Sequence, residues 1–297
     1  MRLLMEAVLL AAAALPANAR EAQKRPPHLG GPHFAVQLRR LKPDELAAAP
    51  FDILILDYSR DGSDQKRLTR EEVARMRKAG RPRTVLAHLP IAEAQDFRYY
   101  WKRSWGDDPP VWLDRGRVRF WEGEWQRLIY GGPDSYLDRI LDAGFDGVVL
   151  DGVDAYKFFD AQGRKTAPDE MKRFVLGLIR YARQSRGLTG FAVYPQNGEE
   201  LLADESYLAA VNGILRDGAY FGYEAESRPT PPRVTEKIER FLDLAVKAEK
   251  TVFILDFVTK PAKKELAYER AHAQGYLMYC GNRDLDRLVR QPWFPEE

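Results

Sequence analysis

Four aspartates of the sequence directly follow short apolar segments, as residues do at the ends of buried strands. They are Asp57, Asp151, Asp217 and Asp256. In a closed barrel of parallel strands, the residues at the carboxyl ends meet at one mouth, where the active sites of such barrels lie. Since aspartates also cap helices, a purely structural role is an equal alternative for each of them. Four acids converging on one mouth nonetheless indicate a site built from carboxylates.

A carboxylate cluster suits the cleavage of a glycosidic bond. One carboxyl group protonates the leaving oxygen, and a second acts as nucleophile or activates water. Like charges held close together raise the pKa of one group, which keeps an acid available near neutral pH. Hard divalent cations also prefer oxygen ligands, so the aspartates alone leave a metal-dependent hydrolase open as an alternative.

The histidines and the single cysteine do not point to other chemistry. The four histidines are scattered and form no HxH or HExxH spacing, which leaves a zinc site unsupported. Cys280 lies in an apolar run and is expected to be a buried structural thiol rather than a nucleophile. We therefore expect no metal and no cofactor.

Beyond residue 32, short apolar runs alternate with longer segments of helical period, a pattern typical of βα units around a parallel sheet. Such runs, almost continuously apolar, indicate strands covered on both faces. No glycine-rich dinucleotide fingerprint follows the first run, which disfavours an open doubly wound sheet. The predicted fold class is therefore α/β, a (β/α)8 TIM barrel. Its strands are expected at Phe34 to Leu38, Ile53 to Asp57, Thr84 to Leu89, Gly147 to Asp151, Gly190 to Tyr194, Gly213 to Asp217, Val252 to Phe257 and Tyr276 to Cys280.

Helices are predicted between these strands from apolar residues at three- and four-residue spacing. The first has well-marked ends, with a Thr69 cap, Glu72 three residues later and Gly80 after the last turn. The predicted helices run from Thr69 to Ala79, Ser135 to Ala143, Pro168 to Ser185, Arg233 to Glu249 and Pro261 to Gln274.

A long aromatic-rich insertion separates the third and fourth strands. It holds about 55 residues, more than an ordinary crossover needs, and five of the six tryptophans. Insertions of this kind sit at the mouth of a barrel, and aromatic rings there could stack on sugars. The alternative is that most of the rings form the core of the insertion itself. The rings are Tyr99, Tyr100, Trp101, Trp105, Trp112, Trp121 and Trp125.

The length and charge of the chain limit its partners. A chain of 297 residues fits one barrel domain, which we place at residues 33–297. The 46 basic and 44 acidic residues leave a net charge of +2, too small a bias to indicate nucleic acid or an anionic membrane. We expect no nucleic-acid partner, and the composition does not assign an oligomeric state.

The N-terminus has the features of an export signal. Arg2 precedes an apolar stretch that ends in Ala17-Asn18-Ala19, the small-x-small pattern of a cleavage site. Residues 1–19 are therefore predicted to be a signal peptide, and residues 20–32, rich in Pro and Gly, a linker. An amphipathic helix or a retained anchor is the alternative. We expect a periplasmic or secreted protein with no stable membrane span in the mature chain.

Several motifs together resemble glycoside hydrolase family 114, the endo-α-1,4-polygalactosaminidases and relatives, some formerly described as cysteinyl-tRNA synthetase-like. The similarity covers about residues 34–290, with its motifs in the expected order. The motifs are FDILILDYSRDG (51–62), LPIAEAQDFRYYW (89–101), GFDGVVLDGVDAY (144–156) and YPQNGEELL (194–202).

The resemblance implies a retaining mechanism on a (β/α)8 barrel. It places the nucleophile on Asp151 and the acid/base on Asp217, where the family pattern has Glu. This difference matters because Asp is one methylene shorter and retaining enzymes hold their carboxyl groups about 5 to 5.5 Å apart. Three outcomes are open: Asp217 serves, Glu224 reaches in, or the protein binds sugar without efficient turnover.

The same resemblance implies a cationic polysaccharide substrate, partly de-N-acetylated galactosamine polymer. Carboxylates would then provide counter-charges, and other polar residues near the strand ends would bind hydroxyl groups. The leading hypothesis is an exported endo-glycosidase, and the alternative is a catalytically weak carbohydrate-binding barrel that handles polysaccharide. The expected substrate contacts are Asp57, Tyr58, Glu93, Asp154, Tyr156, Gln196, Asn197, Arg216 and Asp256.

Overall fold

The computed structural model describes residues 32–78, 82–114 and 117–292. The predicted signal peptide (1–19), the linker up to residue 31 and the last five residues of the predicted domain lie outside the described residues. In the described part of the chain, none of the helices has the length and apolar character needed to cross a membrane.

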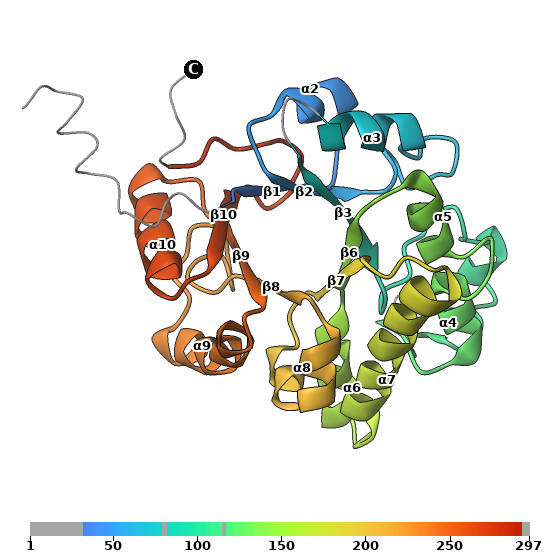
Figure 1. The fold of residues 1–297 in the computed structure, drawn as a ribbon. Helices are drawn as coiled ribbons and strands as arrows, with labels where there is room; N and C mark the ends of the chain where they lie inside the picture. Colours follow the sequence, from blue (N-terminus) through green and yellow to red (C-terminus); the bar gives the residue numbers. More distant parts are fainter. Residues whose placement is uncertain (1–31, 79–81, 115–116, 293–297) are drawn as a thin grey trace, which may run out of the picture.

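Eight parallel strands form a ring with the helices outside it, as the view along the ring axis shows (Figure 1). The predicted strands and the α/β barrel fold class are confirmed. The fifth strand begins two residues later than predicted, because Phe191 N–H bonds Leu188 in a turn and pairing starts at Ala192. The strands are β1 (Phe34–Gln37), β2 (Ile53–Asp57), β3 (Thr84–Pro90), β6 (Gly147–Asp151), β7 (Ala192–Pro195), β8 (Gly213–Asp217), β9 (Thr251–Phe257) and β10 (Leu277–Gly281).

The ring consists of two curved sheets that meet at two seams. One sheet has the order β1-β2-β3-β6-β7 and the other β10-β9-β8. At one seam a parallel bridge pairs Gln196 with Leu215, just beyond the end of β7. At the other, the rings of Phe34 on β1 and Tyr279 on β10 are 5.8 Å apart.

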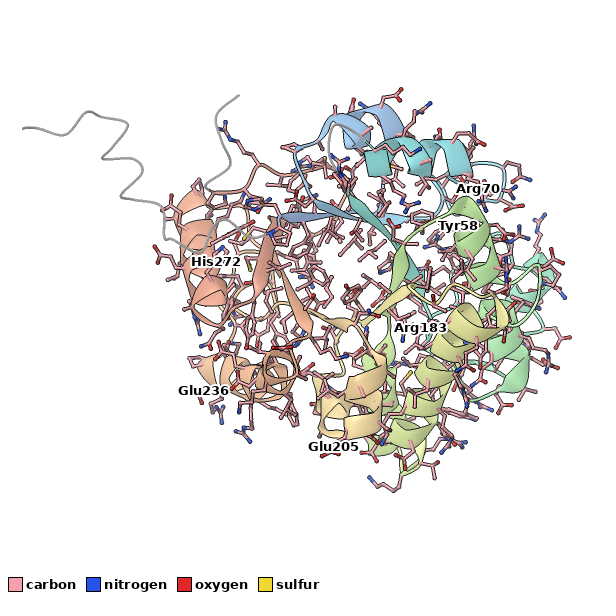
Figure 2. All side chains as sticks on the ribbon, in the orientation of Figure 1. Tyr58, Arg70, Arg183, Glu205, Glu236 and His272 are labelled. Carbon is pink, nitrogen blue, oxygen red and sulfur yellow. The ribbon has the colours of Figure 1, made fainter. Side chains whose placement is uncertain are left out.

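Apolar side chains fill the inside of the ring (Figure 2). Phe253 of β9 contacts Phe34 of β1 and Tyr194 of β7, with ring centroids 4.9 and 5.0 Å apart. Since these three strands come from different parts of the ring, the contacts tie both sheets together. Nearly all residues of the strands are buried, as expected for a barrel whose other face is covered by helices.

Five long helices correspond to the predicted ones, and shorter helices add to them. The predicted cap of the first is present, since Thr69 Oγ1 accepts from Glu72 N–H at 3.2 Å and Glu72 accepts from Thr69 N–H at 3.0 Å. The short helices have too few turns for a helical period to be visible in the sequence. The predicted helices are α3 (Arg70–Lys78), α5 (Tyr136–Ala143), α7 (Ala167–Arg180, continued by a π-turn at Tyr181–Ser185), α9 (Pro232–Lys247) and α10 (Pro261–Ala273); the short ones are α2 (Pro43–Ala48), α4 (Gly123–Ile129), α6 (Tyr156–Ala161) and α8 (Glu205–Ala210).

The insertion between β3 and β6 has an aromatic core of its own. It includes the antiparallel pair of strands β4 (Leu113–Asp114) and β5 (Arg117–Val118). Trp112 lies between Trp105 and Trp125, with ring centroids 5.0 and 4.9 Å away. Trp125 is fully buried and its indole N–H donates to the Ile91 carbonyl at 2.7 Å. These rings pack on one another in the core of the insertion, which is the alternative to stacking on sugars that the sequence left open.

Candidate active site

Asp151 ends β6 at the mouth of the barrel, with its side chain 31% exposed. The Nε2 atom of His88 lies 3.4 Å from one carboxylate oxygen, and Gly152 N–H donates to the other at 2.8 Å. Burial would raise the pKa of Asp151, but the hydrogen bond and charge of His88 and the Gly152 amide outweigh it and lower the pKa below its ordinary value. Asp151 is thus an ionised group that substrate can reach.

His88 owes its place to the register of the first three strands. On β3 it pairs with Asp57 of β2, while Pro90, two residues on, pairs with Asp151 of β6. The side chain is 9% exposed, and its Nδ1 is buried without a hydrogen-bond partner among the described residues. His88 was not among the predicted site residues, since the sequence shows it only as one of four scattered histidines.

Asp217 ends β8, and its side chain is 27% exposed. Gln196 Nε2 and Asn197 Nδ2 donate to one oxygen at 3.1 and 3.4 Å, and Arg216 Nη1 donates to the other at 2.9 Å. Arg216 also donates to Asn197 Oδ1 at 2.8 Å and lies 3.4 Å from buried Glu199. Three of the predicted substrate contacts therefore hold Asp217 in place.

Two tight turns bring Asp154 beside the other carboxylates. Asn197 and Gly198, just after β7, both have left-handed backbone, with φ of 59° and 66°. The turn after β6 packs directly against them, because a Cβ on Gly198 would lie 3.0 Å from a methyl carbon of Val153 and 3.5 Å from Asp154 N. Here glycine is required both by the backbone angle and by the close approach.

Asp154 is a half-buried carboxyl group with an unusual pKa. Burial chiefly raises it, and the nearby charges of Asp217 and Asp151 add to the effect against Lys157, so that the pKa reaches about 6. Asp151, Asp154 and Asp217 therefore form one electrostatically connected group, which we call the carboxylate cluster.

Asp57 lies at the same mouth but is closed off by an ion pair. Its two oxygens are 2.8 and 2.7 Å from the two terminal nitrogens of Arg98, a bidentate contact with side chains 7% and 3% exposed. Arg98 belongs to the insertion, and its Nε donates to Gln95 at 2.7 Å. This ion pair joins the end of β2 to the insertion and leaves little of Asp57 exposed.

Asp256 and Tyr58 are buried beneath the loops at the strand ends. Asp256 is 0% exposed and accepts hydrogen bonds from the amides of Tyr220 and Phe221. Burial raises its pKa to about 7 despite these amides. Tyr58 is also 0% exposed and donates to the Gly62 carbonyl at 3.3 Å. Neither side chain presents a surface to a ligand.

The remaining predicted contacts differ in their access. Glu93 is exposed on the insertion, where it pairs with Arg117 in an isolated bridge. Tyr156 is 6% exposed and its hydroxyl donates to Glu200 at 3.2 Å. Glu224, the alternative acid, is exposed and bound to Arg228 at 2.8 Å.

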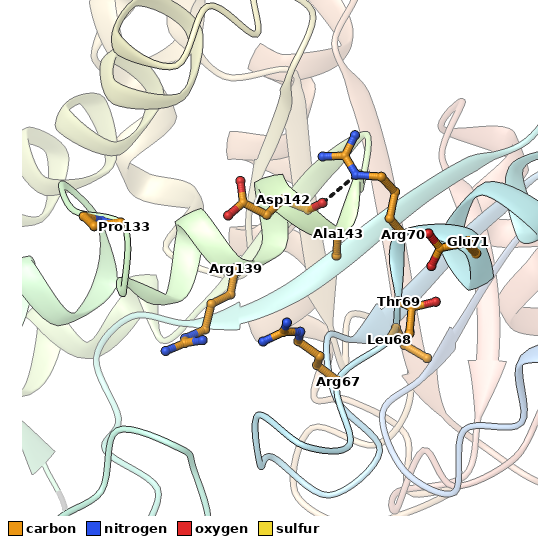
Figure 3. A pocket seen from close by; sticks show the side chains of 9 residues that line it. All are labelled: Arg67, Leu68, Thr69, Arg70, Glu71, Pro133, Arg139, Asp142 and Ala143. Carbon is orange, nitrogen blue, oxygen red and sulfur yellow. Dashed lines mark hydrogen bonds between the residues drawn. The ribbon is translucent and has the colours of Figure 1, made fainter.

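A separate cavity of about 290 Å³ lies outside the mouth, between the start of α3 and α5 (Figure 3). Arg67 and Arg139 both bind Asp64 Oδ1 at 2.8 Å, and Arg70 Nε donates to the Asp142 carbonyl at 2.9 Å. None of the predicted site residues lines this cavity. Among the described residues, no group of three or more His, Cys, Asp or Glu side chains could hold a metal ion.

Comparisons with known proteins show the family of the chain. The sequence model of glycoside-hydrolase family GH114 matches residues 12–293. An uncharacterized protein of Methanocaldococcus jannaschii is 30% identical over 86% of this chain and 77% of its own. An uncharacterized protein of Deinococcus radiodurans is 31% identical over 90% of this chain and 85% of its own.

Among solved structures, the glycoside hydrolase domain of PelA from Pseudomonas aeruginosa has a similar fold. The TM-score is 0.65 at 16% identity, and the match covers 87% of this chain and 98% of that domain.

Proposed function

The chain belongs to glycoside hydrolase family 114, and from this premise we propose that it cleaves an α-1,4-linked galactosamine-type polysaccharide by a retaining mechanism. In the proposed reaction, Asp151 attacks the anomeric carbon and forms a covalent glycosyl-enzyme intermediate as the leaving oxygen takes up a proton. Asp217 supplies that proton and then removes one from the water that releases the intermediate.

The observation that carries the proposal is the opposite shift of two neighbouring carboxyl groups. His88 and the Gly152 amide lower the pKa of Asp151 in spite of burial, whereas burial and nearby negative charge raise the pKa of Asp154 to about 6. Retaining cleavage needs one ionised carboxylate and one protonated carboxyl group at the same site. Two groups whose surroundings separate their pKa values are the usual sign of this division of roles.

The same observation makes Asp154 a second candidate for the proton donor. Both oxygens of Asp217 are already bound by N–H donors of Gln196, Asn197 and Arg216. Asp154 carries its proton up to about pH 6, according to its raised pKa. Asp217→Asn and Asp154→Asn distinguish the two candidates, because only substitution of the true proton donor should remove the basic limb of the pH–rate profile.

The proposed contacts with substrate are the accessible part of the predicted set. The partly exposed Asp154 and Asp217, with Glu93 on the insertion, supply negative charge for cationic units of the polymer. Export through the N-terminal leader also belongs to the proposal, since a polysaccharide outside the cell would be the substrate. N-terminal sequencing of protein recovered from the medium or periplasm tests it.

The test of the enzyme proposal is release of reducing ends from galactosamine polymers by the wild type and by Asp151→Asn. The variant should lose on the order of a thousandfold or more in rate, because the nucleophile is removed. Asp134→Asn, whose side chain is 95% exposed, is the matched control and should retain full rate. An active wild type with an equally active Asp151→Asn would remove Asp151 from the nucleophile role.

A catalytically weak carbohydrate-binding barrel is the second candidate function. It is favoured by Asp217, which is one methylene shorter than the Glu of the family pattern. This function predicts that oligosaccharides bind without products and that Asp217→Glu does not restore cleavage. Ready turnover by the wild type would exclude it.

A further inference from the structure

A cavity of about 450 Å³ opens at the barrel mouth next to the carboxylate cluster, between the loops that follow β1, β2 and β3. His88 lines it and also lies 3.4 Å from Asp151, so one side chain separates the cavity from the proposed nucleophile. A cavity of this size is large enough for a sugar ring.

Phe97 gives the cavity a partly exposed aromatic ring, with the Arg98 guanidinium over one of its faces. The Phe97 side chain is 53% exposed, although most rings of the insertion are packed on one another. A large apolar side chain left uncovered at a cavity marks a place where a ligand would cover it. The faces of aromatic rings pack well on the apolar C–H faces of sugar rings, because both surfaces are flat and weakly hydrated.

The Phe97 ring is fixed in place before any ligand arrives. Gly62 has a φ of +85°, and a Cβ there would lie 2.5 Å from Phe97 Cδ2 and 2.9 Å from its carbonyl oxygen. Tyr99 N–H donates to the Gly62 carbonyl at 3.1 Å, which joins the Phe97 segment to the loop after β2. The Arg98 guanidinium lies 4.8 Å from the ring centroid. Little freedom is therefore lost when a ligand stacks on the ring.

The charges around the cavity provide no net negative charge to hold a cationic unit. Four arginines and two aspartates line it, but Arg98 is paired with Asp57, Arg40 with Asp286 and Arg60 with Glu72, which leaves Arg39 and Asp61 without an ion pair among the described residues. Arg39 is exposed. An ammonium group would therefore gain no net counter-charge in the cavity, whereas hydroxyl and amide oxygens would accept hydrogen bonds from the guanidinium groups.

We propose that this cavity is a sugar subsite that seats one uncharged hexopyranose unit, such as an N-acetylated hexosamine, on the face of Phe97 beside Asp151. The inference rests on the proposed glycosidase function and refines it. A polymer chain would then place an uncharged unit at Phe97 and its cationic units toward Asp154 and Asp217. The enzyme would accordingly distinguish polymers by where along the chain their acetyl groups lie.

The test compares Phe97→Ala with Val111→Ala, a control in the same insertion whose side chain is 71% exposed and does not line the cavity. Oligosaccharides of defined acetylation are the probes, with KM, kcat and product lengths as readouts. Phe97→Ala should raise KM about tenfold for N-acetylated substrates and shift the product lengths, because one stacking contact is lost. Val111→Ala should behave as the wild type.

Arg39→Glu is the second variant and tests the charge preference. It should narrow the difference in KM between N-acetylated and de-N-acetylated oligosaccharides, because the exposed cation is replaced by an acid. An active wild type in which Phe97→Ala matches Val111→Ala in KM and products overturns the subsite alone. If Arg39→Glu leaves the difference in KM between N-acetylated and de-N-acetylated oligosaccharides unchanged, the proposal that the subsite binds an uncharged unit is overturned.

Calorimetric binding of the same oligosaccharides separates the two proposals. If the wild type binds these oligosaccharides but cleaves none of them, and Phe97→Ala binds them more weakly, the glycosidase function is overturned and the subsite is supported. A wild type that neither cleaves nor binds them overturns both.

Discussion

Asp57 and Asp151 both end a parallel strand at the same mouth of the barrel, yet their surroundings differ. Both oxygens of Asp57 accept from Arg98 and its side chain is 7% exposed, whereas the side chain of Asp151 is 31% exposed and, within the described part of the chain, its carboxylate is bound by His88 and the Gly152 amide. The strand sets where each carboxylate lies. What the carboxylate can do is decided by the partner that reaches it.

The partner of Asp57 comes from a distant part of the sequence, whereas the partner of Asp151 comes from the neighbouring strand. Arg98 lies 41 residues from Asp57, on the insertion, while His88 is brought to Asp151 by the pairing of β3 with β6. One side of the mouth thus uses an acid to hold the insertion on the barrel. The other side keeps its acids accessible for chemistry.

The largest expected effect concerns the structural side of this comparison. Arg98→Ala leaves Asp57 buried without its counter-ion, and the loss of one partner of a buried pair costs about 3 to 5 kcal/mol of the free energy of unfolding. Denaturant unfolding followed by circular dichroism measures it. Lys42→Ala, which breaks an exposed pair of side chains 68% and 69% exposed, is the control and should cost less than about 1 kcal/mol. A comparable loss in both variants would contradict the structural role of Asp57.

Asp217→Asn should lower the rate strongly and the free energy of unfolding only slightly, unlike Arg98→Ala. Its rate should fall about a hundredfold, the lower end expected for loss of a positioned acid or base, or roughly 2.7 kcal/mol in activation free energy. The free energy of unfolding should change by less than about 1 kcal/mol, because the side chain is 27% exposed. Steady-state rates and denaturant unfolding on the same preparation test both statements. A variant that unfolds as easily as Arg98→Ala would make Asp217 structural too.

The smallest effect is on the pH dependence of stability and comes from Asp154. Its folded-state pKa is raised to about 6, so between about pH 4 and pH 6 the folded protein holds a proton that the unfolded chain has released. The free energy of unfolding contributed by Asp154 therefore falls as pH rises through this window. Asp154→Asn removes the dependence and should gain stability relative to the wild type between pH 4 and pH 6, with no further gain above. Thermal unfolding in buffers across this range measures it, with Asp44→Asn, 93% exposed, as control. A constant difference between Asp154→Asn and wild type would refute the raised pKa.

The barrel itself could be predicted because its strands are continuous apolar runs. Each strand is covered on both faces, so burial alone makes it visible in the sequence. The first long helix was equally clear, since Thr69 and Glu72 form the cap that their spacing predicts. The short helices α6 and α8 were missed because six residues are too few to show a helical period.

The candidate site could be predicted only as far as the strand ends reach. Asp151 and Asp217 lie where their strands place them, but the burial of Asp256 beneath the amides of Tyr220 and Phe221 depends on the loop after β8. Phe97 was overlooked in favour of its tryptophan neighbours, because no pattern separates an exposed ring from a packed one. Its one signal was a position between Asp96 and Arg98, where polar neighbours indicate a surface.

The tryptophan cluster of the insertion also has a spectroscopic consequence. Five of the six tryptophans of the chain lie in this segment, and Trp101, Trp105, Trp112 and Trp125 follow one another with ring centroids 5.5, 5.0 and 4.9 Å apart. At these separations the indoles exchange excitation energy, so intrinsic fluorescence reports mainly on the insertion. Detachment of this segment would change the tryptophan emission while the far-ultraviolet circular dichroism of the barrel persists. Unfolding of the insertion and of the barrel can therefore be followed separately in one sample.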